Sequence, residues 1–322
     1  MGGRTARGAL VVALATFTST CAPASRSLPP CDLSPALESV AANAPVVTVA
    51  AVGDVADCNG GDHTAVAAVI DSMRPDAVLA LGDLAYPNGS IDELVDCYGP
   101  SLGRFRKITR ATPGNHEYHT PHAGAYYAYF CGSSGEAFKG YYSFDVGRWH
   151  VVSLNSNCGR DLDVVSDVAD DFGGCEEGSP QATWLRADLE AHGAGCTLAM
   201  WHHPRFSAGS EGPSPMVDAL WRIVVEHGVD IVLNGHAHDY QRYPPLGKDG
   251  DRDDEGGTRV FIVGTGGVKL TSFDANPVRS EVRQNASHGA LRLELREHGY
   301  AWSFMPVSGD TLHDDGSATC RR

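Results

Sequence analysis

Positively charged residues are scarce in this chain of 322 residues. Lysine and arginine total 25 against 40 aspartates and glutamates, so the formal net charge at pH 7 is −15. A groove for a nucleic-acid polymer or a site for an anionic membrane surface needs the opposite sign of charge, so the composition argues against both partners. A small anionic substrate is still compatible with this charge, because bound cations would invert the potential locally.

The sequence also lacks internal repeats and any apolar run of transmembrane length, so we expect no membrane span. An apolar run over 9–17 follows Arg4 and Arg7 and precedes small residues and two prolines. This order is typical of a secretory signal peptide. We therefore predict a signal peptide over 1–30, a linker over 31–45 and one catalytic domain over 46–322. The residues before Cys21 are a poor match to a lipobox, so we expect a secreted, cell-surface or periplasmic protein rather than a lipid anchor at Cys21.

No two of the nine cysteines have CxxC spacing, which argues against a zinc knuckle. Eight cysteines remain if Cys21 belongs to the leader, and an even number in an exported chain indicates disulfides. The sequence does not define how they pair. We favour Cys158–Cys175, which would close an acidic loop over 157–178. The eight are Cys31, Cys58, Cys97, Cys131, Cys158, Cys175, Cys196 and Cys320.

Five apolar runs are each followed by a glycine or proline motif that carries candidate metal ligands. Parallel strands of an open α/β sheet place their carboxyl ends along one edge, where ligands bind. Carboxylate, phenol, amide and imidazole groups are all metal-ligand types, so their repetition at strand ends predicts a metal centre. The side chains are Asp54 after 46–52, Asp83 and Tyr86 after 77–81, Asn115 and His116 after 108–113, His202 and His203 after 196–201, and His236 and His238 after 230–234.

These motifs, GD, GDxxY, GNHE, HxP and GHxH in that order, resemble the calcineurin-like metallophosphoesterase superfamily. The tyrosine of GDxxY resembles the one that purple acid phosphatases carry at this position. The segment Val263–Gly267 also resembles secreted bacterial members of the family. The resemblance covers roughly 46–242. It implies an α/β fold, a four-layer α/β/β/α sandwich of two packed mixed sheets. It also implies hydrolysis of small phosphomonoesters by attack of a metal-bound hydroxide.

Carried onto this sequence, the family pattern assigns two metal ions. The ligands of one ion, the first set, would include two carboxylates and a phenol, which suit Fe(III). Those of the other ion, the second set, would include an amide and two imidazoles, which suit a divalent ion such as Zn, Mn or Fe(II). The HxP pattern selects His202 over His203, which we expect to be a neighbour or a substrate contact. His116 resembles the phosphate-contacting histidine of the family, which could donate a proton to the leaving group. The first set is Asp54, Asp83, Tyr86 and His238, and the second is Asn115, His202 and His236, with Asp83 shared.

Simpler interpretations exist for each residue taken alone. Asn115 could be a turn residue, His236 a surface histidine, and Tyr86 a ring packed over its loop with the hydroxyl in water. We prefer the ligand interpretation because five motifs occur in one order. His119 and His122 lie in a polar loop, where we expect them to be solvated.

Two other functions fit the same residues. A phosphodiesterase acting on nucleotides or phospholipids would use the same metals. A metal-stabilised binding protein without turnover is less favoured, because His116 accompanies a full ligand set. Two departures from the family bear on tuning and on the general acid: Ala237 and Gln241 stand where relatives often carry acidic residues, and 206–211 lacks a histidine found in some plant-type enzymes.

Hydrophobic periodicity predicts alternating strands and helices. We expect an N-cap at Asp62, a capping serine at Ser90 and another at Ser179. The expected strands are 46–52, 77–81, 141–144, 150–154, 196–201, 231–233, 259–263, 291–295 and 301–304, and the expected helices are 62–73, 90–93, a helix from 179 onward, and 215–226.

Overall fold

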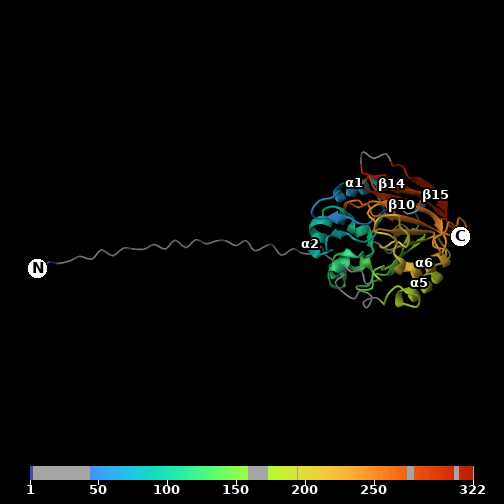
Figure 1. Cartoon of the computed structure of the whole chain (residues 1–322), viewed down its shortest axis with the longest axis horizontal. Helices are drawn as coiled ribbons and strands as arrows, with labels where there is room; N and C mark the ends of the chain where they lie inside the picture. Colours follow the sequence, from blue (N-terminus) through green and yellow to red (C-terminus); the bar gives the residue numbers. More distant parts are fainter. Residues whose placement is uncertain (3–43, 159–172, 194, 274–278, 308–311, 322) are drawn as a thin grey trace.

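Two mixed β-sheets form the centre of the molecule (Figure 1). The computed structural model describes residues 1–2, 44–158, 173–193, 195–273, 279–307 and 312–321. The six-stranded sheet has the order β15 (Asp315–Thr319), β14 (Gly299–Pro306), β13 (Gly289–Arg296), β1 (Val46–Val52), β3 (Ala77–Ala80) and β5 (Thr109–Ala111). The seven-stranded sheet has the order β12 (Val282–Gln284), β10 (Tyr240–Leu246), β11 (Thr258–Val263), β9 (Ile231–Asn234), β8 (Thr197–Met200), β7 (Trp149–Ser153) and β6 (Tyr142–Val146). A small third sheet pairs β2 (Ala56–Asp57) with β4 (Ala85–Tyr86).

The core between the two sheets is built by alternate residues of facing strands. Val49 and Leu79 from the six-stranded sheet belong to the same buried cluster as Leu198, Leu233 and Phe261 from the seven-stranded sheet. The residues between them in sequence point outward and meet helices, as expected for the period of two along a strand. Both faces of each central strand are therefore apolar, which explains the continuous apolar runs in the sequence.

Helices cover the outer faces of the two sheets. Helix α1 (His63–Met73) and the pair α5 (Pro180–Ala191) and α6 (Asp218–Glu226) lie on opposite sides of the molecule (Figure 1). The buried faces of these helices include Val66 and Ile70 of α1, Leu185 of α5 and Leu220 of α6. Shorter helices are α2 (Ile91–Glu93), α3 (Gly124–Phe130), the π-helix η1 (Leu94–Tyr98), and the 3₁₀ helices η2 (Leu102–Ile108), η3 (His116–His119), η4 (Pro121–Ala123), η5 (Cys131–Ser134) and η6 (Pro215–Val217). The predicted four-layer α/β/β/α sandwich is confirmed.

The predicted caps give mixed results. Ser90 forms a full capping box with Glu93, and the Ser179 hydroxyl accepts a hydrogen bond from Ala182 N. Asp62 stands at the N-cap position of α1 but makes no capping hydrogen bond, and its carboxylate instead accepts from His288 Nδ1 at 2.7 Å. The helix expected over 215–226 is divided into η6 and α6.

Three disulfides join described cysteines: Cys58–Cys97, Cys158–Cys175 and Cys196–Cys320. The expected pair Cys158–Cys175 is thereby confirmed. The predicted signal peptide, Cys21, Cys31 and most of the acidic loop over 157–178 lie outside the described residues, so those predictions stand as predictions. Among the helices that the structure describes, none has both the length and the apolar composition needed to cross a membrane.

Candidate metal centre

The predicted strand ends meet at one edge of the sandwich. β1 pairs in parallel with β3, and β3 with β5, so Asp54, Asp83 and Asn115 follow neighbouring strands of one sheet. In the other sheet β8 pairs in parallel with β9, which places His202 beside His236. Because both sheets present carboxyl ends at this edge, residues up to 184 positions apart in sequence come into contact there.

The backbone at three of these positions adopts a left-handed conformation that side chains other than glycine rarely take. The φ angles are 59° at Asp54, 52° at Asp83 and 69° at His236. Such residues cost of order 1–3 kcal/mol and cluster at functional sites. Gly235 shows how tightly the chains pass, because a Cβ atom there would lie 2.7 Å from Asp54 Oδ2. All three positions lie in the turns that follow β1, β3 and β9.

On one side of the centre, several lone pairs surround a single hydroxyl group. The Tyr86 hydroxyl oxygen lies 3.0 Å from Asp54 Oδ1, 3.0 Å from Asp83 Oδ2 and 3.2 Å from His238 Nε2. A phenol has one proton to donate, so it cannot satisfy two carboxylates at once. Burial and the neighbouring Asp54 and Asp83 charges raise the pKa of Tyr86 well above its usual value. A bound cation would remove this crowding of electron pairs, and the residues fit one.

Three histidines at the edge share one orientation. His202 Nδ1 lies 2.8 Å from Leu81 O, His238 Nδ1 lies 3.1 Å from Lys269 O, and His116 Nδ1 lies 2.6 Å from Pro87 O. A carbonyl oxygen only accepts, so each Nδ1 carries a proton, and in the neutral ring that a metal ion would bind, each Nε2 presents a lone pair. A second-shell carbonyl of this kind is the usual partner of a metal-binding histidine.

On the other side of the centre, buried polar atoms have no partner. Asn115 Oδ1, His202 Nε2 and His203 Nε2 are inaccessible to solvent and make no hydrogen bond with the described residues. His202 Nε2 lies 3.2 Å from Asp83 Oδ2, but without hydrogen-bond geometry. One group of candidate ligand atoms comes from Asp54, Asp83 and His202, and another from His202, His203 and His236. Unpartnered buried donors and acceptors are rare in native proteins, so this side also fits a cation.

The charges of the centre shift the pKa values of its histidines in opposite directions. For His202 and His238, burial lowers the pKa but the nearby aspartates raise it more, to about 9 in each case. For His236, burial and the neighbouring His202 lower the pKa to about 4. Asp83 is buried, which raises its pKa, but His202 and His116 hold that pKa well below its usual value. Without a bound ion, the aspartates therefore attract positive charge to His202 and His238, whereas His236 is a neutral imidazole.

His116 lies at the mouth of the centre. Its Nε2 is 3.8 Å from Asp83 Oδ2, its side chain is 23% exposed, and its ring packs against Tyr86 at 4.2 Å. This position lets the ring reach both the centre and the solvent. His119 is not solvated as expected, because its Nδ1 also approaches Pro87 O, at 3.0 Å, and its ring packs on His116. The two residues lie one turn apart on a 3₁₀ helix, where i and i+3 align.

Two residues of the centre had no role assigned from the sequence. The buried Glu117 carboxylate accepts the backbone N–H groups of Asp83, Leu84 and Gly114 at 2.7–2.9 Å and so fixes two motif loops together. Its pKa is raised to about 7 by burial and by Asp83. Ser156 contacts His203 through both its Nδ1 and its backbone N–H. The sequence contained a feature that could have identified each of them. Glu117 is part of the GNHE motif, and Ser156 follows the end of β7, which is a sixth strand end.

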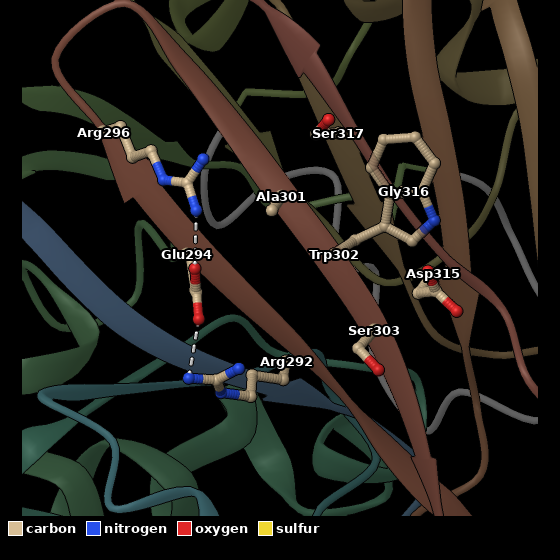
Figure 2. A pocket seen from close by; sticks show the side chains of 9 residues that line it. All are labelled: Arg292, Glu294, Arg296, Ala301, Trp302, Ser303, Asp315, Gly316 and Ser317. Atoms are coloured by element: carbon tan, nitrogen blue, oxygen red, sulfur yellow. Dashed lines mark hydrogen bonds and ion pairs between the residues drawn. The ribbon is translucent and has the colours of Figure 1, made fainter.

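A separate hollow of about 370 Å³ lies over β13, β14 and β15 (Figure 2). It contains two arginines, but Glu294 accepts an ion pair from each, from Arg292 at 2.8 Å and from Arg296 at 2.9 Å. An anionic ligand would compete with that carboxylate for both guanidinium groups. The hollow also lacks the metal-ligand side chains of the edge described above, so we do not assign the function to it.

Comparison with known proteins identifies the family of the chain. The calcineurin-like phosphoesterase family matches residues 47–240. Similar sequences include purple acid phosphatase 15 of Arabidopsis thaliana, 28% identical over 52% of this chain and 36% of that protein, and purple acid phosphatase 22 of the same plant, 28% identical over 76% and 58%. The chain thus spans between about a third and three fifths of the length of these two relatives.

Solved structures share the fold. The purple acid phosphatase PPD1 of yellow lupin (Lupinus luteus) superposes with a TM-score of 0.67 and 19% identity, covering 86% of this chain and 54% of that one. GAP50 of Plasmodium superposes with a TM-score of 0.64 and 12% identity, covering 87% and 90%. The family match extends over more than half of the chain and includes all five motifs. The chain therefore belongs to the calcineurin-like phosphoesterase family, and the sequences similar to it include purple acid phosphatases.

Proposed function

We propose that this chain is an exported hydrolase of small phosphomonoesters that works with two metal ions. The observation that carries the proposal is the meeting of seven ligand-type side chains from five strand ends. On the side of Tyr86, too many lone pairs face one hydroxyl group. On the side of His202, buried polar atoms make no hydrogen bond with the described residues. The residues that would hold the first ion are Asp54, Asp83, Tyr86 and His238, and those for the second are Asn115, His202 and His236, with Asp83 touching both.

The kinds of donor atom support a mixed pair of ions. Two carboxylates and a phenol form a hard, anionic set that suits Fe(III), whereas an amide and two imidazoles suit Zn, Mn or Fe(II). Such a pair supplies Lewis acidity toward water and toward the phosphoryl oxygens. The negative net charge of the chain then presents no obstacle to an anionic substrate, because the local potential follows the ions.

The remaining residues bind, orient and move protons. His116, with Nδ1–H directed to Pro87 O, has its Nε2 free to hold a proton for the leaving group at the mouth of the centre. His203 would contact the phosphoryl group from the buried side. Glu117 accepts backbone N–H groups from the loops of Asp83 and Gly114 and so fixes their relative position. This contact would keep the Asp83 carboxylate in place between the two ions.

Export is supported by the disulfides Cys58–Cys97, Cys158–Cys175 and Cys196–Cys320, since such bonds persist in oxidising compartments. The substrate would be a small phosphoester rather than a nucleic-acid polymer. We leave the oligomeric state open.

Elemental analysis and paired rate measurements test the proposal. Protein purified from an oxidising compartment should contain two metal ions per chain and hydrolyse p-nitrophenyl phosphate faster than bis(p-nitrophenyl) phosphate. Absence of turnover on both esters in metal-replete protein would overturn it. The second candidate is a phosphodiesterase on the same metals. It is favoured by one relative, the nucleotide pyrophosphatase/phosphodiesterase of Hordeum vulgare, 24% identical over 74% of this chain and 70% of that protein. A faster rate on the diester would select it.

A further inference from the structure

Four histidines at the metal centre use Nδ1 in two different ways. His116, His202 and His238 direct Nδ1 to a backbone carbonyl oxygen. His203 alone directs Nδ1 to a hydroxyl, that of Ser156, at 2.9 Å. A carbonyl can only accept a hydrogen bond, whereas a hydroxyl can also donate one. The proton of the His203 ring is therefore not fixed by the rule that applies to the other three.

The contacts of the Ser156 hydroxyl decide where that proton lies. Ser156 is fully buried, and its Oγ already accepts the backbone N–H of His203 at 3.0 Å. Its hydrogen needs an acceptor, because a buried polar group without one is costly. The acceptor that the described part of the chain provides is His203 Nδ1. The hydroxyl accordingly donates to Nδ1, and the ring proton lies on Nε2.

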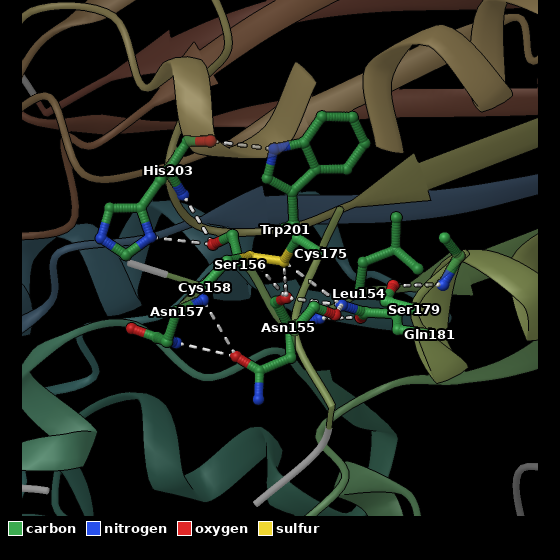
Figure 3. The surroundings of a disulfide bond; sticks show 12 residues. Leu154, Asn155, Ser156, Asn157, Cys158, Cys175, Ser179, Gln181, Trp201 and His203 are labelled. Carbon is green, nitrogen blue, oxygen red and sulfur yellow. Dashed lines mark hydrogen bonds between the residues drawn. A yellow bond between two sulfur atoms is a disulfide. The ribbon is translucent and has the colours of Figure 1, made fainter. Parts of the chain in front are cut away.

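Ser156 is held in place independently of His203. Gln181 brackets the preceding residue, Asn155, because its Oε1 accepts from Asn155 N at 2.7 Å and its Nε2 donates to Asn155 O at 2.9 Å. Two residues after Ser156, the disulfide Cys158–Cys175 attaches the same segment to the loop that precedes α5 (Figure 3). The serine therefore imposes an orientation on the histidine, and not the reverse.

The free nitrogen of His203 points away from Ser156 (Figure 3). This Nε2 is buried and has no partner among the described residues, and the ring lies 4.5 Å from the ring of His236 and 4.9 Å from that of His202. It thus presents an N–H group to the histidine side of the centre.

We propose that Ser156 is a positioning residue that fixes His203 as the Nε2–H tautomer, so that His203 donates a hydrogen bond to a phosphoryl oxygen instead of acting as a third histidine ligand. The statement rests on the proposed function for the identity of the acceptor, but not for the tautomer. A ligand role would need the opposite tautomer, with Nδ1–H donated to Ser156 Oγ and the buried serine hydrogen left without an acceptor.

The tautomer is measurable without turnover. Full-length protein loaded with zinc, a diamagnetic ion, and labelled with ¹⁵N-histidine should show a His203 Nε2 signal coupled to a proton and an Nδ1 signal of the unprotonated type. The variant His203→Gln identifies the signal by its loss. In Ser156→Ala the His203 signals should move away from this pattern. A His203 Nε2 that carries no proton and has the shift of a metal-bound nitrogen would overturn the proposal.

Variants separate the donor from a ligand. Glutamine can place an N–H near the position of Nε2, whereas leucine cannot. His203→Leu should bind inorganic phosphate roughly 10- to 100-fold more weakly, the range for a hydrogen bond to a charged group, and His203→Gln should recover most of that loss. Ser156→Ala should fall between them. Ser101→Ala removes another buried hydroxyl, one that bonds to Cys97 O and Tyr98 O, and should bind phosphate like the wild type.

Metal content distinguishes the outcomes. Two ions per chain in His203→Leu would support the donor role, and the loss of one ion would overturn it. Equal phosphate affinity in His203→Leu and wild type would also overturn it. If the wild-type protein binds phosphate but hydrolyses no phosphoester, the proposed function fails, while the tautomer and phosphate measurements still decide the role of His203.

Discussion

The two sides of the metal centre differ in what they lack. Around Tyr86, oxygen atoms of Asp54 and Asp83 lie 3.0 Å from one hydroxyl, so electron pairs face each other with too few protons between them. On the histidine side, Asn115 Oδ1 and His202 Nε2 are buried and make no hydrogen bond with any residue that the structure describes. A cation would remove the repulsion between lone pairs on the first side. On the second side, a cation would give the buried atoms a partner.

This difference teaches that the two cation positions have unequal charge and unequal dependence on their residues. The oxygen side carries carboxylates and suits an ion of high charge, and its ligands repel each other without it. The histidine side would hold its ion through an amide and imidazole rings, so the removal of one of these ligands should weaken metal binding less than the removal of a carboxylate. Asp83 belongs to both sides, because it contacts the Tyr86 hydroxyl as well as the His202 ring.

The largest effect is expected from Asp83→Ala, which removes the group common to both sides. Bound metal and turnover should both disappear, since neither ion keeps a full ligand set. Elemental analysis and the rate on p-nitrophenyl phosphate measure the two losses. Asp188→Asn alters a partly buried carboxylate that bonds to His150 instead, and should keep both ions. Two ions per chain in Asp83→Ala would show that the two sides do not share this residue.

His116→Ala should separate chemistry from metal binding. The variant should keep both ions and lose rate by roughly 10²–10⁴-fold, the range for a lost general acid. A substrate with a better leaving group should narrow the loss, because it needs less protonation. If the variant loses an ion, or if its rate falls equally for good and poor leaving groups, His116 does not act as the proton donor.

Tyr86→Phe tests whether the oxygen side holds Fe(III). Only a strong Lewis acid would keep this phenol ionised, because burial and two carboxylates raise its pKa. A tyrosinate–Fe(III) bond absorbs visible light, so iron-loaded wild type should be violet and Tyr86→Phe colourless. His202→Ala changes the other side and should leave the colour. Colourless wild-type protein that is active and replete with iron would exclude Tyr86 as an Fe(III) ligand.

The sequence predicted the residues on both sides of the centre, because the motifs that carry them are short and lie next to apolar strands. Each ligand lies within six residues of the end of an apolar strand, and β1, β3, β8 and β9 occur close to the expected positions. Neighbouring parallel strands then bring the motifs to one edge with no further information.

Other features depend on contacts that local patterns do not encode. Strand β10 contains Pro244 and Pro245, and its pairing with β11 is interrupted between Arg242 and Pro245, so a run with two prolines did not predict a strand. Strand β15 is a short edge strand of small and polar residues without a large apolar side chain to mark it. Ser156 acquires its importance only when β7 and β8 are paired and His203 lies beside it.

Glu117→Gln should weaken the link between the motif loops of the two sides. The wild-type carboxylate accepts three backbone N–H groups, whereas glutamine offers one acceptor oxygen and directs an NH₂ group at the rest. The expected loss of stability is about 1–3 kcal/mol, the cost of leaving a buried group unsatisfied. Urea unfolding of metal-loaded protein measures it. An unchanged free energy of unfolding would show that the loops are held by other contacts.

The smallest effect is expected at His150, a buried histidine that contrasts with those of the centre because both its nitrogens have partners. Nε2 lies 2.7 Å from Asp188 Oδ2 and Nδ1 lies 3.0 Å from Asp145 Oδ1, and the ring stacks on His192 at 3.9 Å. Burial lowers the pKa of His150, but the hydrogen bonds to Asp188 and Asp145 raise it above its usual value. Burial likewise raises the pKa of Asp188, whereas its hydrogen bonds to His150 and Ser143 lower it below its usual value.

The signs of these shifts define a pH window. A histidine with a raised pKa contributes its full stability below the unfolded value of about 6.5 and loses it as the pH rises through the folded value, while the carboxylate contributes above about 3.9. Between these limits the pair is fully ionised. His150→Gln should therefore reduce the free energy of unfolding more at pH 6 than at pH 9. Urea unfolding at both pH values, with the same metal loading, measures the difference. A larger loss at pH 9 would mean that His150 is neutral in the folded protein, and that its two carboxylate contacts do not distinguish it from the neutral His236 of the metal centre.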